Sequence, residues 1–205
     1  MDDAPATDLT GRAMAPGALA LVQAFVNTAD LAGGHDELTD QAQLVAWLVA
    51  RGLIESDAAV DETVVRRVIE VREAIRALLV GNAGGTIGPE ATAILSRAAT
   101  AARLTIAFDD AQHASLVPMS GGIDEALGHL LAIVYAAMVD GSWVRLKACR
   151  AESCRWTFYD ASKNRSGIWC SMAICGNRQK TRTYRARRAV TETRTGSESN
   201  RSEPQ

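Results

Sequence analysis

The sequence predicts an α+β chain, in which a mostly helical N-terminal domain with a small antiparallel sheet precedes a cysteine-containing module made of a hairpin and a basic helix. Three observations carry this prediction. Apolar residues recur at spacings of three and four along most of residues 17–140, as in amphipathic helices. The spacing changes to alternation near residue 105, which is typical of a strand. All four cysteines lie between residues 149 and 175.

The chain's size and charge narrow the classes of protein to which it can belong. Its 205 residues suffice for one medium domain and a small appendage. With 47% hydrophobic and 22% charged residues, neither disorder throughout nor a collagen-like structure is expected. The net charge of -2 hides two opposite regions: residues 1–140 hold 19 acidic and 8 basic residues, a balance of -11, whereas residues 141–188 hold 2 acidic and 12 basic, a balance of +10. The basic segment predicts an anionic partner.

The first helices follow from spacing and capping residues. Residues 1–16 lack periodicity and are predicted to be a disordered tail, and residues 19–27 fit a short helix better than a strand. Asp40 and Gln43 resemble a capping box that opens a helix running to Gly52. The next helix is expected to run from Ser56–Asp57 to Gly81–Asn82. Its charged residues are predicted to form a solvated face.

The remainder of the larger domain, which is predicted to span residues 17–140, combines two helices with a hairpin. Pro89 at a first-turn position opens a helix that reaches residue 102. Alternation then predicts a strand whose apolar residues are Leu104, Ile106 and Phe108. After a polar turn at 109–113, residues 115–119 are expected to pair back. A final apolar helix reaches Asp140, and it is too short and interrupted to predict a membrane span, so no membrane partner is expected.

The cysteines form two close pairs in the pattern Cys-x4-Cys-x15-Cys-x4-Cys. They are Cys149, Cys154, Cys170 and Cys175. Each pair can form one clip of a tetrahedral site, and a hairpin between the pairs would bring the clips together, which predicts one zinc ion (Zn²⁺) per chain. Two disulfides or four idle thiols stay as alternatives. Because the N-terminus is acidic and polar, we expect a cytoplasmic protein, where reduced thiols serve as metal ligands.

The segment between the cysteine pairs predicts a small hairpin, and a basic helix is expected to follow it. Trp156 and Phe158 alternate on one side of a strand, residues 160–167 are rich in turn formers, and residues 168–170 are expected to return as the second strand. Such a module would draw much of its folding free energy from the metal, on the order of 10 kcal/mol. Residues 177–188 contain neither proline nor glycine and are predicted to be helical, whereas residues 189–205 are predicted to be a disordered tail.

Cationic and amide side chains of this module are candidates for nucleic-acid binding. They are Asn177, Arg178, Lys180, Arg182, Arg185, Arg187 and Arg188 in the helix, with Lys163 and Arg165 at the tip of the hairpin. Like charges at these spacings repel one another, and an anionic partner would relieve the repulsion. Asn177 and Arg178 suit the edges of bases, whereas the later arginines suit phosphates. Asn177 serves equally well as a local cap.

Several stretches resemble a known family. Residues 145–149, 154–160, 169–172 and 175–178, the last reading Cys-Gly-Asn-Arg, resemble the CGNR zinc finger. Upstream, residues 25–28 and 46–48 resemble the ABATE domain, which accompanies this finger in bacterial stress-induced transcription regulators. The resemblance implies a finger with four cysteine ligands and a regulatory role in nucleic-acid binding. Gly167–Ile168 depart from the family pattern, which commonly has arginines there.

The sequence therefore predicts a zinc-dependent transcriptional regulator that binds double-stranded DNA. The larger domain would sense an unknown small-molecule effector, form a homodimer, or both. RNA binding and docking of the basic finger onto an acidic protein partner stay as alternatives. No enzyme is predicted and no catalytic residue is assigned, because the sequence lacks a nucleophile elbow, a phosphate-binding loop and a dinucleotide motif. Turn chemistry accounts for Asp109, Asp110 and His113.

Overall fold

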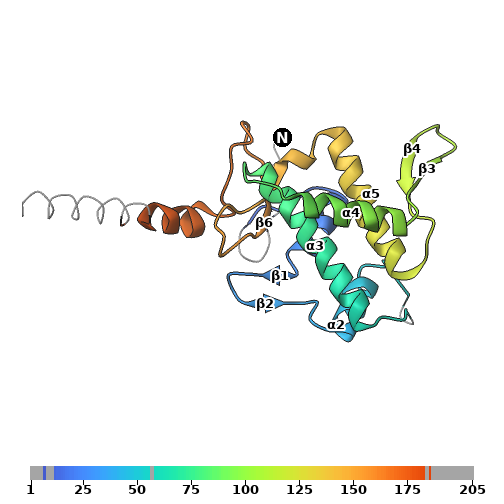
Figure 1. Ribbon diagram of the computed structural model, residues 1–205. Coiled ribbons are helices and arrows are strands. Elements are labelled where there is room, and N and C mark those ends of the chain that lie inside the picture. The colour runs from blue at the N-terminus through green and yellow to red at the C-terminus, as the bar shows by residue number, and fades with distance from the viewer. Residues whose placement is uncertain (1–6, 8–11, 56–57, 183–184, 186–205) are drawn as a thin grey trace, which may run out of the picture. The chain divides into compact units, whose positions relative to one another are not determined.

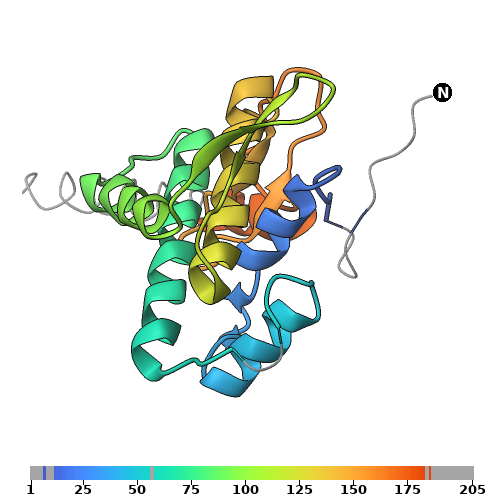
Figure 2. The same ribbon diagram turned by 90° about the vertical axis from the view of Figure 1, so that its right-hand side faces the viewer.

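The computed structural model describes residues 7, 12–55, 58–182 and 185, and its contacts divide the chain into two compact units, Met1–Cys170 and Ser171–Gln205. The described part of the first unit contains five α-helices: α1 (Leu19–Val26), α2 (Gln41–Val49), α3 (Glu62–Asn82), α4 (Pro89–Ala101) and α5 (Gly122–Asp140) (Figures 1 and 2). The six strands of this described part form three two-stranded sheets. The predicted finger, residues 141–188, extends over both units. The domain limits expected from the sequence, 17–140 and 141–188, stay a prediction.

Capping side chains set the starts of α2 and α3. Asp40 accepts a hydrogen bond from the Gln43 backbone N–H at 2.9 Å, which is one half of the predicted capping box, whereas the Gln43 side chain accepts from Thr39 instead of Asp40. α3 begins at Glu62 rather than near residue 56, because Asp61 is the residue whose carboxylate accepts from the Val64 N–H, at 2.8 Å. The predicted start at Ser56–Asp57 lies outside the described residues.

The core lies where α1, α3, α4 and α5 pack together. α3 contributes a buried stripe whose members are Val65, Val68, Val71, Ile75 and Leu79. α5 is long and apolar enough to cross a membrane by length and composition alone, contrary to the expectation from its sequence. Its buried face, which includes Leu127, Leu130 and Val134, packs into this core, as in the central helix of a water-soluble fold.

Two arginines of α3 are buried, so the prediction of a wholly solvated charged face is wrong. Arg72 and Arg76 are 3% and 4% exposed. Arg72 binds the Asp36 carboxylate with two hydrogen bonds of 2.7 Å, at the end of the hairpin formed by β1 (Ala29–Asp30) and β2 (His35–Asp36). Burial and the hydrogen bond from Arg72 act in opposite directions on Asp36, and the net effect is a lowered pKa. Helical spacing identified the apolar stripe but not these polar anchors.

The predicted hairpin forms, but its apolar face lies open. β3 (Thr105–Phe108) pairs antiparallel with β4 (Ala114–Val117), and the two strands project beyond α4 and α5 (Figure 1). Ile106 lies opposite Leu116 and Phe108 opposite Ala114, so these four side chains share one face. Ile106 is 62% exposed and Phe108 75% exposed. Alternation usually marks a half-buried strand, whereas this face has no cover among the described residues.

Residues 12–16, placed in the predicted tail, pack on the first unit. The Ala13 carbonyl accepts from the Tyr159 N–H at 3.1 Å, and Ala15 is buried. The Arg12 guanidinium lies 4.8 Å from the centre of the Trp156 ring. Most of the predicted tails at 1–16 and 189–205 lies outside the described residues.

Candidate metal centre and basic segment

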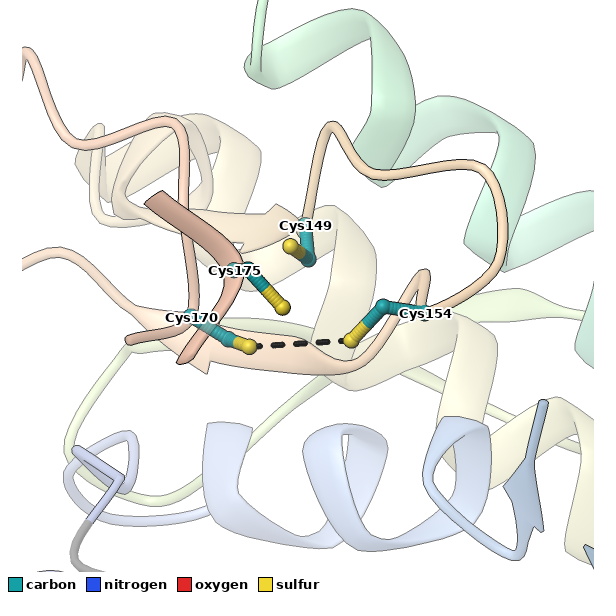
Figure 3. Close-up of side chains that lie close together, drawn as sticks. All are labelled: Cys149, Cys154, Cys170 and Cys175. Atoms are coloured by element: carbon teal, nitrogen blue, oxygen red, sulfur yellow. Dashed lines mark hydrogen bonds between the residues drawn. The ribbon is translucent and has the colours of Figure 1, made fainter. Parts of the chain in front are cut away.

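The four cysteines meet in one buried cluster, in which their side chains point toward one another (Figure 3). Their sulfur atoms lie within 4.8 Å of one another, and the Cys154 and Cys170 sulfurs are 3.7 Å apart. A tetrahedron of thiolates around zinc, with Zn–S bonds of about 2.3 Å, has edges of about 3.8 Å. A disulfide would need about 2.05 Å, and none of the four cysteines forms one. The four cysteines therefore form a cluster that could hold one metal ion, as the predicted zinc site requires.

The first cysteine pair is shaped by two tight turns that aim backbone N–H groups at sulfur. The Cys149 sulfur accepts from the Ala151 N–H, and the Cys154 sulfur accepts from the Trp156 N–H. The Cys154 N–H donates to the Ala151 carbonyl at 2.9 Å, which closes the turn. Arg155 has a left-handed backbone with φ 49°, and this lets the next amide turn back toward sulfur. N–H donors to thiolates orient metal ligands and stabilise their charge.

The thiols are close enough to shift one another's pKa values. Hydrogen bonds from Cys154 and Cys170 lower the pKa of Cys149 to about 2. The bond with Cys149 raises the pKa of Cys154 to about 12, and it also raises the pKa of Cys170. Four thiolates cannot share this volume without a cation, because like charges repel. A divalent cation among them removes that repulsion, so the donor set fits zinc.

The strand pairing around the centre differs from the prediction. β6 (Thr157–Tyr159) pairs with β5 (Leu146–Ala148), not with residues 168–170. Residues 160–167 loop around the Lys147 ammonium group, and this places the Ile168 carbonyl 2.9 Å from the Arg150 N–H instead. Gly167 is one of the two residues, with Ile168, that depart from the family pattern. A Cβ atom at position 167 would lie 2.9 Å from the Asp160 carboxylate, so no larger residue fits this loop as it stands.

Polar side chains of the helical part hold the strand beside the metal centre. Asn27 pairs with the backbone of Thr157, donating to its carbonyl and accepting from its N–H, both at 2.8 Å. Gln23 donates to the same carbonyl at 3.2 Å. The Arg76 guanidinium donates to the Arg155 carbonyl, directly after a cysteine ligand, at 3.0 Å. Sequence reasoning missed these anchors, although Asn27 lies in the stretch that resembles the ABATE domain.

The predicted nucleic-acid-binding residues lie on the surface where they are described. Residues 177–182 are helical, and the side chains of Asn177, Arg178, Lys180, Arg182 and Arg185 are exposed. A short π-helical turn, η2 (Met172–Gly176), carries Cys175 into this segment, with the Cys175 N–H donating to the Ser171 carbonyl at 2.9 Å. Arg187 and Arg188 lie outside the described residues.

Two details bear on the roles predicted for this segment. The Asn177 amide donates to the Ala173 carbonyl at 3.3 Å, which is the local role expected of a cap. Lys163 and Arg165 are exposed in the loop at 161–166. Within the described part of the chain, none of the cationic residues predicted to bind nucleic acid forms an ion pair with a carboxylate. Their contact with nucleic acid stays a prediction.

Comparison with protein families assigns both parts of the chain. The CGNR zinc finger family matches residues 145–188. The ABATE family, whose description reads "Putative stress-induced transcription regulator", matches residues 19–141. A comparison with curated proteins finds no match. The chain therefore belongs to the ABATE family and carries a CGNR zinc finger after its ABATE domain.

Proposed function

We propose that this protein is a zinc-dependent transcriptional regulator that binds double-stranded DNA through residues 177–188. The observation that carries the proposal is the exposed basic segment that follows Cys175. Its described cations, Arg178, Lys180, Arg182 and Arg185, all face solvent, in a chain whose first 140 residues have a balance of -11. A basic surface whose described cations form no ion pair with a carboxylate favours a polyanion, because phosphate contacts release counterions.

The position of each side chain divides the roles within this segment. Arg178 lies next to the turn that carries the predicted ligand Cys175 and can read a guanine edge with two hydrogen bonds. Arg182 and Arg185 lie farther along and suit phosphates, which fix the register on the duplex. Asn177 already bonds within its own turn, so Arg178 carries the proposed base contact.

The ABATE domain would supply sensing and association. We propose a homodimer that covers the open apolar face of the β3–β4 hairpin, since exposed patches of this kind mark interaction sites. A cleft of about 660 Å³ between α2 and α3 is the proposed effector site. It is lined by Thr39, Asp40, Gln41, Ala42, Glu62, Val65, Arg66 and Ile69.

Two further proposals concern catalysis and cellular location. The two matching families are a zinc finger and a transcription regulator, which supports the proposal that this protein is not an enzyme. The Asp109–His113 pair lies exposed in the hairpin turn at 3.4 Å, which agrees with a turn role. Reduced, clustered thiols favour a cytoplasmic location.

Replacement of Arg178, Arg182 and Arg185 together by alanine tests the proposal. We expect the variant to keep its zinc, because none of the three is a ligand, and to lose most of its affinity for duplex DNA. Fluorescence anisotropy with a labelled duplex measures the affinity, and metal analysis measures the zinc. Undiminished affinity would show that this helix is not the binding element, and docking of the finger onto an acidic protein would then be the better hypothesis.

A further inference from the structure

The loop between β6 and Ile168 carries an exposed surface with basic and no acidic side chains. The side chains of residues 161–166 are all exposed, and their sequence is Ala-Ser-Lys-Asn-Arg-Ser. Two of the six, Lys163 and Arg165, are cations, and none is acidic. The others include two hydroxyls and an amide, the polar groups that commonly contact phosphate and sugar oxygens in nucleic acids.

A buried ion pair holds this loop from the inside. Lys147 is 3% exposed and Asp160 5% exposed, and their charged groups meet at 2.8 Å. The Lys147 ammonium group also donates to the carbonyls of Arg165 and Gly167, the latter at 3.0 Å. The Asp160 carboxylate accepts from the backbone N–H groups of Ser162 at 3.1 Å and Gly167 at 2.7 Å. The charges of Lys147 and Asp160 are thus neutralised by partners within the loop.

A second cation anchors the start of the loop. Arg145 donates from one guanidinium nitrogen to the carbonyls of Asp160 at 3.0 Å and Ser162 at 2.9 Å. Four carbonyls of the loop therefore accept hydrogen bonds from Lys147 or Arg145. These bonds neutralise part of the negative charge of carbonyl oxygens that would repel an anion, while Lys163 and Arg165 stay exposed.

We propose that residues 160–167 form a preformed contact for the phosphodiester backbone of nucleic acid, separate from the helix at 177–182. Lys163 and Arg165 would touch the phosphates. Lys147, which counts toward the basic balance of the segment, and Arg145 are positioning residues. A loop ordered before binding loses little conformational entropy when it binds, which favours even a small contact surface. This inference rests on the proposed function, because it adds a contact to the same nucleic-acid-binding activity.

Charge removal at the tip of the loop tests the proposed contact. The zinc-loaded full chain and its Lys163→Gln/Arg165→Gln variant would be titrated with a labelled duplex at several salt concentrations. Each lost phosphate contact should weaken binding about eightfold at about 0.1 M salt and reduce the salt slope by about 1. Arg97→Gln is the matched control, because Arg97 is an exposed cation of α4 in the same unit. Its affinity and salt slope should match the wild type.

Gly167→Ala tests the positioning role without changing any charge. Its Cβ would lie 2.9 Å from the Asp160 carboxylate, so the loop must shift. We expect a weaker affinity and a reduced salt slope at unchanged zinc content, because Lys163 and Arg165 would then be misplaced. Gly121→Ala is the matched control, because a Cβ atom there meets nothing within 4 Å and the backbone is extended, and it should bind like the wild type. If Gly167→Ala does not fold, the charge variant decides alone.

The outcomes separate this inference from the proposed function. Unchanged affinity and slope in the Lys163→Gln/Arg165→Gln variant would overturn the loop contact, while loss of binding in the helix variant would leave the proposed function standing. Equal losses in this variant and in Arg97→Gln would also overturn it, because the effect would then be one of overall charge. A wild-type protein that binds no nucleic acid would overturn both.

Discussion

Asn27→Ala should destabilise the protein and loosen its metal centre, because Asn27 joins the helical part to the strand beside the cysteines. Its amide makes two hydrogen bonds of 2.8 Å with the backbone of Thr157. Thr157 is fully buried and lies three residues after the ligand Cys154. Alanine at position 27 removes both bonds.

The expected loss of stability follows from these contacts. Each lost bond contributes about 1 kcal/mol, and an unpaired buried N–H at Thr157 costs about 1–3 kcal/mol. The Thr157 carbonyl keeps Gln23 as a donor at 3.2 Å, so the carbonyl adds little. The sum is about 2–4 kcal/mol, a large share of a typical stability of about 5–15 kcal/mol. With an m-value of about 2–3 kcal/mol/M in urea, the midpoint should fall by about 1 M.

Urea unfolding of the zinc-loaded protein, followed by circular dichroism, measures this loss. Competition with a chelator measures how fast zinc leaves, and the variant should release it faster than the wild type. Thr157→Val is the control. Its hydroxyl is buried without a hydrogen-bond partner among the described residues, so its removal should preserve or slightly raise stability. If the urea midpoint of Asn27→Ala equalled that of the wild type, the coupling between the helical part and the metal centre would be refuted.

Three further predictions concern the metal, a carboxylate and the hairpin. Protein purified under reducing conditions should contain one zinc per chain, and Cys170→Ser should lose it because only three thiolates remain; a metal-free, disulfide-bonded protein would contradict the site. Burial alone would raise the pKa of Asp160, but hydrogen bonds from Lys147, Ser162 and Gly167 outweigh it and lower the pKa to about 2. The lowered pKa contributes about 2 kcal/mol of stability, which is fully present above an unfolded pKa of about 3.9 and is lost as the pH falls toward 2. Carbon-13 NMR should therefore show the Asp160 carboxyl still ionised at about pH 4, and a proton bound there would be inconsistent with the ion pair. Phe108→Ser should dissociate a wild-type homodimer in sedimentation experiments, and a wild type that is monomeric at all concentrations would exclude this interface.

Local patterns predicted most of the helices, because spacing and capping act within a few residues. Asp40 and Pro89 marked helix starts correctly. The start of α3 was placed too early, because the apolar pattern extends back to Val60 while the capping hydrogen bond comes from Asp61. The paired spacing of the cysteines predicted the metal cluster, because four thiols that share one ion must lie together.

Features that depend on contacts between distant residues could not be predicted in the same way. The side chains of Arg72 and Arg76 resemble surface charges in sequence, and only their partners 36 to 79 residues away explain their burial. In the sequence, Lys147 looks like one more cation of a basic segment. In the structure it forms a buried ion pair with Asp160 inside a loop. That loop redirects the chain, so β6 pairs with β5 and not with the residues that follow it.

Titration of the zinc-loaded full chain with duplex DNA and with structured RNA, at two salt concentrations, tests the central claim most directly. The proposed function predicts tighter binding to the duplex. Phosphate contacts from Lys163, Arg165, Arg182 and Arg185 would give a salt slope of about -4. Tighter binding to RNA would assign the protein to a different class of nucleic-acid binder, and the absence of salt-dependent binding to either polymer would contradict the account.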